Sequence, residues 1–151
     1  MLVQPSGAFP QIPVTPTPQA RGEIPCPRKE SPLRVLVVDD EPLVLWSIAE
    51  RLRAYGVDLW EAADARGALR ILSSESDPPD VILLDLRLPD SSDLSLLTAM
   101  RGLAPAARVI LMTAFGTPEV SDEARRLGAF AVIEKPFDLD DLEGLLARGV
   151  P

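Results

Sequence analysis

The 151-residue sequence contains no histidine and only one cysteine, Cys26. A single thiol cannot form an internal disulfide, and a zinc site made of cysteine and histidine ligands needs several such residues. The lack of histidine also excludes the Ser-His-Asp and Cys-His pairs that many hydrolases use. The chemistry that is left depends on carboxylates, hydroxyls and cationic side chains.

Aromatic residues are scarce, at 5% of the sequence, whereas hydrophobic residues of all kinds make up 46%. We therefore expect a mainly aliphatic core. No apolar run approaches the roughly eighteen residues of a membrane-spanning helix, and the N-terminus lacks the charged and apolar regions of a signal peptide. These absences favour a cytoplasmic protein that makes no contact with a membrane.

Basic residues are outnumbered, with 15 Lys and Arg against 23 Asp and Glu and a net charge of −8. Direct binding of nucleic acid favours a basic face, so this balance argues against it. Eight of the 16 prolines lie in residues 1–32, which show neither helical nor strand periodicity. We expect this segment to be a disordered, proline-rich tail.

From residue 33 onward, short apolar runs alternate with segments of helical periodicity. Continuous apolar runs are typical of strands that are buried on both faces of a parallel sheet. Helix ends are marked by proline at the first turn, by Asp or Thr as N-cap and by glycine after the last turn. The expected strands are 35–38, 57–60, 81–84, 109–112 and 129–133, and the expected helices follow Pro42, Asp64, Ser92, Thr117 and Asp138, the third ending before Gly102.

Five strand–helix units predict an α/β fold, a (βα)5 doubly wound parallel sheet with right-handed crossovers. The expected domain covers residues 33–148, with residues 149–151 as the C-terminal end. This length leaves no room for a second domain.

Polar residues follow four of the five expected strands: Asp39, Asp40, Asp85, Thr113 and Lys135. In an open α/β sheet, ligands bind at the carboxyl ends of the strands. Carboxylates about 5 Å apart repel one another by about 3 kcal/mol per pair at an effective dielectric near 20. Lys135 can neutralise one charge, and Mg²⁺ with its oxygen ligands suits the others. Acidic side chains, Mg²⁺ and a lysine together indicate a phosphoryl-transfer site.

Four motifs at these strand ends resemble those of a known family. The motifs are Val37-Val38-Asp39-Asp40-Glu41-Pro42, Leu84-Asp85-Leu86-Arg87-Leu88-Pro89-Asp90, Met112-Thr113-Ala114 and Glu134-Lys135-Pro136-Phe137-Asp138. In this order, they resemble the receiver domain of bacterial two-component response regulators, and they are most similar to receivers of the nitrogen-regulation type. The resemblance implies a flavodoxin-like sheet with strand order 2-1-3-4-5, as in the chemotaxis receiver.

The resemblance also implies roles for the acidic residues. Asp85 would accept a phosphoryl group from a phosphohistidine on a sensor histidine kinase or phosphotransfer protein. Asp40, Asp85 and the backbone carbonyl of Arg87 would hold Mg²⁺, and Asp39 would act through a bound water. Without the other strand-end residues, the acids at 39–41 could equally be a favourable cluster at a helix start.

Two further residues gain roles from the resemblance. Lys135 would pair with the phosphoryl oxygens, and its bond to Pro136 is expected to be cis. Thr113 would donate its hydroxyl to the phosphoryl group after transfer and pull in the following loop. The helix after Thr117 has few apolar anchors, so we expect its position to shift on phosphorylation.

The resulting hypothesis is a single-domain response regulator that catalyses its own phosphorylation and dephosphorylation. It would signal through phosphorylation-dependent contacts with a downstream effector protein. Whether phosphorylation also produces a homodimer is left open. One alternative is a degenerate receiver that binds partners independently of phosphorylation, and another is the receiver fragment of a larger transcription activator.

Two positions depart from the family pattern. Val132 stands where receivers usually have an aromatic residue, and Phe130, two residues earlier, is expected to share its face rather than replace it. Asp93 stands where glycine is usual, and it could cap the following helix or shift the loop that carries the Arg87 carbonyl.

Arg87 and Phe115 are bulky and flank the approach of water to Asp85, which predicts slow hydrolysis of the aspartyl phosphate. Arg87 also argues against an aspartate-nucleophile phosphatase, since that family needs an acid two residues after the nucleophile.

Overall fold

The computed structural model describes residues 32–74 and 76–149, so nearly all of the predicted proline-rich tail lies outside the described residues. Within the described part, strands and helices alternate along the chain as the sequence predicts. The elements are β1 (Arg34–Val38), α1 (Pro42–Arg53), β2 (Asp58–Ala62), α2 (Ala65–Ser74), β3 (Val81–Asp85), α3 (Ser95–Leu103), β4 (Arg108–Thr113), α4 (Pro118–Arg126), β5 (Ala131–Glu134) and α5 (Leu139–Gly149).

The strands form one parallel sheet in the order β2-β1-β3-β4-β5, which confirms the predicted topology. The register aligns their carboxyl ends: Val38 pairs with Leu84, Asp85 with Met112, and Thr113 with Glu134. The residues that follow β1, β3 and β5 therefore emerge at one edge of the sheet.

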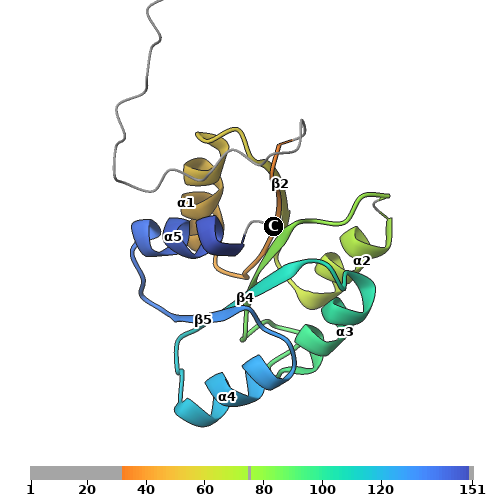
Figure 1. Cartoon of the computed structure of the whole chain (residues 1–151), viewed down its shortest axis with the longest axis vertical. Coiled ribbons are helices and arrows are strands. Elements are labelled where there is room, and N and C mark those ends of the chain that lie inside the picture. The colour runs from red at the N-terminus through yellow and green to blue at the C-terminus, as the bar shows by residue number, and fades with distance from the viewer. Residues whose placement is uncertain (1–31, 75, 150–151) are drawn as a thin grey trace, which may run out of the picture.

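Helices cover both faces of this sheet, α1 and α5 on one side and α2, α3 and α4 on the other (Figure 1). Each side has its own aliphatic core. Leu36, Ile82 and Leu111 point into the first core, with α2, α3 and α4. Val37 and Ile110 point into the second, with α1 and α5. The central strands are buried on both faces, as the continuous apolar runs predict. None of the helices in the described ranges is both long and apolar enough to cross a membrane.

Several predicted helix ends are confirmed by their contacts. The Asp64 side chain accepts a hydrogen bond from the Gly67 N–H at 2.6 Å, and Thr117 accepts one from the Val120 N–H at 3.2 Å. Gly56, just past α1, has φ +74°, a backbone conformation that residues with a side chain rarely adopt. These local signals correctly place the ends of α1, α2 and α4.

The prediction for α3 was wrong at both ends. The helix begins at Ser95 rather than near Ser92, and Gly102 lies within it rather than after it. Leu88 and Ser91 pair as a short antiparallel bridge directly before the predicted start, and the Ser95 N–H then bonds to the Asp93 side chain, so the first helical turn begins at Ser95.

The relation between Phe130 and Val132 also differs from the prediction. Strand β5 begins only at Ala131, so Phe130 lies outside the alternation of side chains. Val132 packs against the core beneath α2, α3 and α4, whereas Phe130 packs against the core on the α1 side. The Arg108 guanidinium carbon lies 5.4 Å from the centre of the Phe130 ring, which adds a cation–π contact.

Candidate functional site

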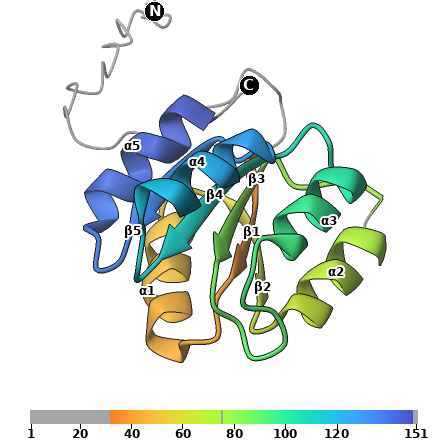
Figure 2. The same cartoon turned by 90° about the horizontal axis from the view of Figure 1, so that it is seen from below.

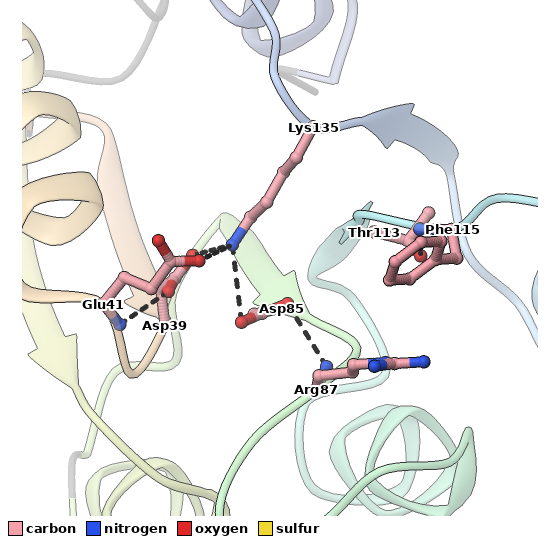
Figure 3. A network of polar contacts seen from close by, with 7 residues as sticks. All are labelled: Asp39, Glu41, Asp85, Arg87, Thr113, Phe115 and Lys135. Carbon is pink, nitrogen blue, oxygen red and sulfur yellow. Dashed lines mark hydrogen bonds and ion pairs between the residues drawn. The ribbon is translucent and has the colours of Figure 1, made fainter.

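Three charged side chains from β1, β3 and the end of β5 meet at the carboxyl edge of the sheet (Figure 3). The Lys135 Nζ donates to Asp39 Oδ2 at 2.6 Å and lies 3.4 Å from Asp85 Oδ2. It also forms an ion pair of 3.4 Å with Glu41 Oε1. The bond between Lys135 and Pro136 is cis, as predicted. One cation is thus surrounded by three carboxylates.

Asp39 has none of its surface exposed, and both of its carboxylate oxygens are bound. Oδ2 accepts from Lys135, and Oδ1 accepts from the Glu41 N–H at 2.9 Å. Glu41 precedes α1, but its side chain makes no capping hydrogen bond to that helix. Asp39 and Glu41 are therefore organised around Lys135, and a cluster that serves only the helix start does not explain their arrangement.

Burial, and after it the negative charge of Asp39, raises the pKa of Asp85 from 3.8 to about 6. The Arg87 N–H, 3.2 Å from Asp85 Oδ1, and the Lys135 ammonium oppose this shift. For Lys135, burial lowers the pKa, but the hydrogen bond to Asp39 and the charges of Asp39, Asp85 and Glu41 together raise it above 10.5. The lysine is consequently cationic at neutral pH.

The carboxylates of Asp39, Asp40 and Asp85 can hold a divalent cation. Each offers an oxygen that lies within 4.8 Å of the other two, and Asp40 faces solvent while the others are buried. Hard oxygen donors, one of them open to water, match the preference of Mg²⁺ for a few carboxylates together with water molecules. The Arg87 backbone adjoins Asp85 through its N–H, and its carbonyl as a fourth ligand stays a prediction.

Thr113 is buried at the end of β4 and lies to one side of the Lys135 network in Figure 3. Its Oγ1 accepts a hydrogen bond from the Phe115 N–H at 3.2 Å. The hydroxyl is therefore engaged with its own loop, and it contacts neither Lys135 nor Asp85 through any bond drawn in that view.

Phe115 and Arg87 form an exposed stack beside the site. The guanidinium carbon of Arg87 lies 4.8 Å from the centre of the Phe115 ring. The ring is 66% exposed, so the pair stands at the rim of the site rather than in the core. Sequence reasoning identified both residues as flanking groups but could not show that they touch.

Of the two outcomes predicted for Asp93, the structure shows a local contact at the start of α3. Its exposed carboxylate accepts from the Ser95 N–H at 2.9 Å, immediately before α3. Asp90, the last residue of the motif that contains Asp85, accepts from the N–H groups of Ala65 and Arg66 at the start of α2. No local sequence pattern predicts that contact, because Ala65 and Asp90 are 25 positions apart in the sequence.

A groove of about 520 Å³ adjoins the site between the start of α1 and the loop before α5. It shares Glu41 and Lys135 with the acidic cluster, and Val44 and Phe137 are among its apolar lining residues. Trp46, on the same helix, is 61% exposed. An apolar surface thus reaches the edge of the charged site.

Comparison with known proteins gives a consistent result. A family model described as the response regulator receiver domain matches residues 35–147. The DNA-binding transcriptional regulator NtrC of Escherichia coli K12 is 33% identical over 116 residues, which cover 77% of this chain and 24% of that protein. Sporulation initiation phosphotransferase F of Bacillus subtilis is 31% identical over 118 residues, covering 78% of this chain and 94% of that protein.

A solved response regulator from Burkholderia pseudomallei, which contains a phosphorylated aspartic acid and a calcium ion, has a TM-score of 0.69 at 27% identity. The match covers 76% of this chain and 66% of that chain. The chain spans only about a quarter of the length of NtrC and of regulatory protein AtoC. With the motifs, the flavodoxin-like sheet and the family match in agreement, the chain belongs to the response regulator receiver domain family.

Proposed function

We propose that this receiver domain accepts a phosphoryl group on Asp85, with Mg²⁺ bound by Asp39, Asp40, Asp85 and the Arg87 carbonyl. The observation that carries the proposal is the convergence of the Asp39, Asp40 and Asp85 carboxylates, whose oxygens lie within 4.8 Å of one another, beside a lysine that pairs with Asp39 and lies 3.4 Å from Asp85. Such a cluster is electrostatically unfavourable unless a cation offsets its charge, and a divalent cation beside a lysine suits the binding of an anionic phosphoryl group.

In the proposed transfer, a carboxylate oxygen of Asp85 attacks the phosphorus of a phosphohistidine or of a small acyl phosphate. The new P–O bond forms while the bond to the donor nitrogen or oxygen breaks, and the donor leaves with that electron pair. When bound, Mg²⁺ offsets the charge of the carboxylates and of the phosphoryl oxygens. Lys135 supports the same oxygens with its ammonium group, which already lies within reach of Asp85.

Thr113 supplies the proposed switch. After transfer, the phosphoryl group on Asp85 carries about 1.5 to 2 negative charges and offers new acceptor oxygens. The Thr113 hydroxyl then reorients from its loop toward the phosphoryl group and brings the β4–α4 loop with it. Helix α4 is suited to respond because Ala124 is its only fully buried side chain among the described contacts.

The phosphodonor is a sensor histidine kinase or a phosphotransfer protein, since this chain has no histidine of its own. We assign the groove beside Lys135 to that donor because it joins an apolar surface to the phosphorylation site. An effector protein, rather than nucleic acid, reads the result in the cytoplasm. In this proposal residues 33–148 form the receiver, and residues 1–32 are a tail.

Incubation with acetyl phosphate and Mg²⁺, followed by a phosphate-affinity gel, tests the proposal. Wild-type protein should give a retarded band that EDTA abolishes. Asp85→Asn should give none, and Asp93→Asn, which neutralises an exposed acid of the next loop, should behave as wild type. A band that persists in Asp85→Asn contradicts the proposal.

A phosphorylation-independent binding module is the second candidate, and Val132 in place of an aromatic is the observation that favours it. Val132 packs as an ordinary core residue beside Leu111, so no ring is available to move between exposed and buried positions. If folded wild-type protein gives no retarded band at all, this alternative is established.

A further inference from the structure

One carboxylate joins the loop between β3 and α3 to the start of α2. Asp90 Oδ1 accepts from the Ala65 N–H at 2.7 Å, and its Oδ2 accepts from the Arg66 N–H at 3.0 Å. Both N–H groups lie in the first turn of α2, where a helix leaves its amides without internal partners. The two hydrogen bonds, first that from Ala65, hold the pKa of Asp90 below 3.8. The contact therefore persists at neutral pH.

The loop that Asp90 anchors is a small hairpin. The Leu88 N–H donates to the Ser91 carbonyl at 2.8 Å, and the Ser91 N–H returns a bond to Leu88 at 3.2 Å. Leu88 is buried in the core next to α2 and α3. Directly before it, the Arg87 N–H donates to Asp85. The Arg87 peptide therefore lies between its own bond to Asp85 and two contacts farther along the hairpin, the burial of Leu88 and the bonds of Asp90 to α2.

We propose that Asp90 is a positioning residue for the divalent cation. It fixes the hairpin to α2 and so holds the Arg87 carbonyl where the cation binds; this inference rests on the proposed function. Asp90 itself does not touch the cation. Without it, the hairpin loses its hydrogen bonds to α2, and cation binding must then also order the Arg87 peptide. Residues that orient metal ligands in this way commonly change affinity by about 10- to 100-fold.

The geometry singles out Asp90 rather than Asp93 for this role. Asp93 lies beyond the hairpin, and its carboxylate bonds only locally, to the Ser95 N–H. In Figure 2 the loop between β3 and α3 runs beside the start of α2, and Asp90 bonds to α2 there. The replacement of the family's usual glycine by Asp93 therefore affects the beginning of α3 and leaves the cation loop anchored.

Calorimetric titration with MgCl₂ tests the proposal on four purified proteins: wild type, Asp90→Ala, Asp64→Ala and Asp93→Ala. Each variant loses one carboxylate, so the loss of negative charge is matched. Asp64→Ala removes the other α2 cap, the bond to the Gly67 N–H, without touching the hairpin. We expect Asp90→Ala to raise the dissociation constant of Mg²⁺ about tenfold and the two controls to stay within about twofold of wild type.

A purely structural role gives a different pattern. In that case Asp90→Ala and Asp64→Ala lower the Tm of the metal-free protein alike, and neither changes the dissociation constant; this result overturns the inference. A positioning role also predicts that the acetyl phosphate reaction of Asp90→Ala, slow at low Mg²⁺, returns to the wild-type rate at saturating Mg²⁺.

The outcomes separate this inference from the proposed function. If wild-type protein binds Mg²⁺ and is phosphorylated while Asp90→Ala binds equally well, only the role of Asp90 is wrong. If wild-type protein does neither, the proposed function and the inference both fail. Should Asp90→Ala not fold, Asp90→Asn and Asp64→Asn replace the alanine pair, and an affinity loss confined to Asp90→Asn supports the role while equal affinities overturn it.

Discussion

Arg87 and Phe115 stack on one another, and each also binds the functional side chain two positions before it. The Arg87 N–H donates to Asp85 and the Phe115 N–H donates to Thr113, each at 3.2 Å, while the guanidinium carbon lies 4.8 Å from the ring centre. Asp85 and Thr113, the proposed nucleophile and the proposed switch residue, are therefore linked through one exposed pair. Movement of Thr113 toward a phosphoryl group must disturb that pair.

We expect this stack to slow the loss of the phosphoryl group. Exposed cation–π pairs contribute about 0.5–1 kcal/mol, and a barrier change of that size corresponds to a rate change of about two- to fivefold. Arg87→Ala and Phe115→Ala should each shorten the half-life of the aspartyl phosphate by such a factor. The double variant should be little faster than either single one, because the two side chains shield the site as a unit. Decay of the phosphate-affinity band after removal of acetyl phosphate measures this.

Leu103→Ala provides the control, since Leu103 is an exposed apolar residue at the end of α3. Its half-life should equal that of wild type. Rapid decay in wild-type protein that neither substitution alters would contradict the shielding role.

Asp85→Asn is expected to stabilise the metal-free protein at neutral pH. The folded state raises the pKa of Asp85 to about 6, so above that pH the native protein bears an unfavourable ionised carboxylate. As pH falls through 6 toward 4, the native state binds a proton that the unfolded state does not, and the penalty disappears. In EDTA, urea unfolding at pH 7.5 should show Asp85→Asn more stable by about 1–3 kcal/mol.

The same measurement at pH 5 should show a smaller difference, because the wild-type carboxyl is then largely protonated. A difference that is constant from pH 7.5 to pH 5 would show that the gain does not come from the ionisation of Asp85.

Lys135→Met should destabilise the metal-free protein strongly. The substitution removes the cation from Asp39, which is completely buried, and from Asp85. Loss of one partner from a buried ion pair typically costs about 3–5 kcal/mol. Mg²⁺ should raise the Tm of this variant more than that of wild type, because the ion can replace the lost positive charge. Thermal unfolding with EDTA or with MgCl₂ tests both statements.

Arg70→Met, a change of equal charge on the exposed surface of α2, should leave the Tm and its response to Mg²⁺ nearly unchanged. Equal losses in the two variants would mean that net charge, rather than the Asp39 contact, determines stability.

Arg51 on α1 bonds to Glu143 and Asp140 on α5, and Glu143 is only 1% exposed. Arg51→Met leaves the Glu143 carboxylate buried without its partner, so we expect a lower urea midpoint. The double variant Arg51→Met/Glu143→Leu should recover much of the loss, because replacing both members of a buried pair by apolar groups removes the unpaired charge. Arg53→Met, whose ion pair with Glu61 is on the surface, should have little effect.

Urea unfolding of the wild type and of these three variants forms the test. Recovery is the decisive outcome, since Arg51→Met alone also removes packing of the arginine stem. A double variant no more stable than Arg51→Met would show that the lost contacts of the stem, and not the stranded carboxylate, cause the effect.

The sequence alone was sufficient for the doubly wound parallel sheet and for Asp39, Asp85 and Lys135 at its carboxyl edge, while the strand order came from the resemblance to receiver domains. Five apolar runs with helical segments between them allow few topologies, and parallel strands bring their carboxyl ends to one edge. Asp39, Asp85 and Lys135 follow three of those strands directly, so their convergence requires no long-range information. The ends of α1, α2 and α4 were likewise predicted because their caps act within three residues.

Only the tertiary structure decided the contacts between segments distant in the sequence. Asp90 could be assigned to a turn from its neighbours, yet its partners lie at the start of α2. The sequence pattern did not single out Glu143, but the packing of α5 against α1 buries it beside Arg51. The physical reason is the range of the signal. Helix caps and apolar periodicity act over a few residues, whereas these contacts depend on how two complete elements pack against each other.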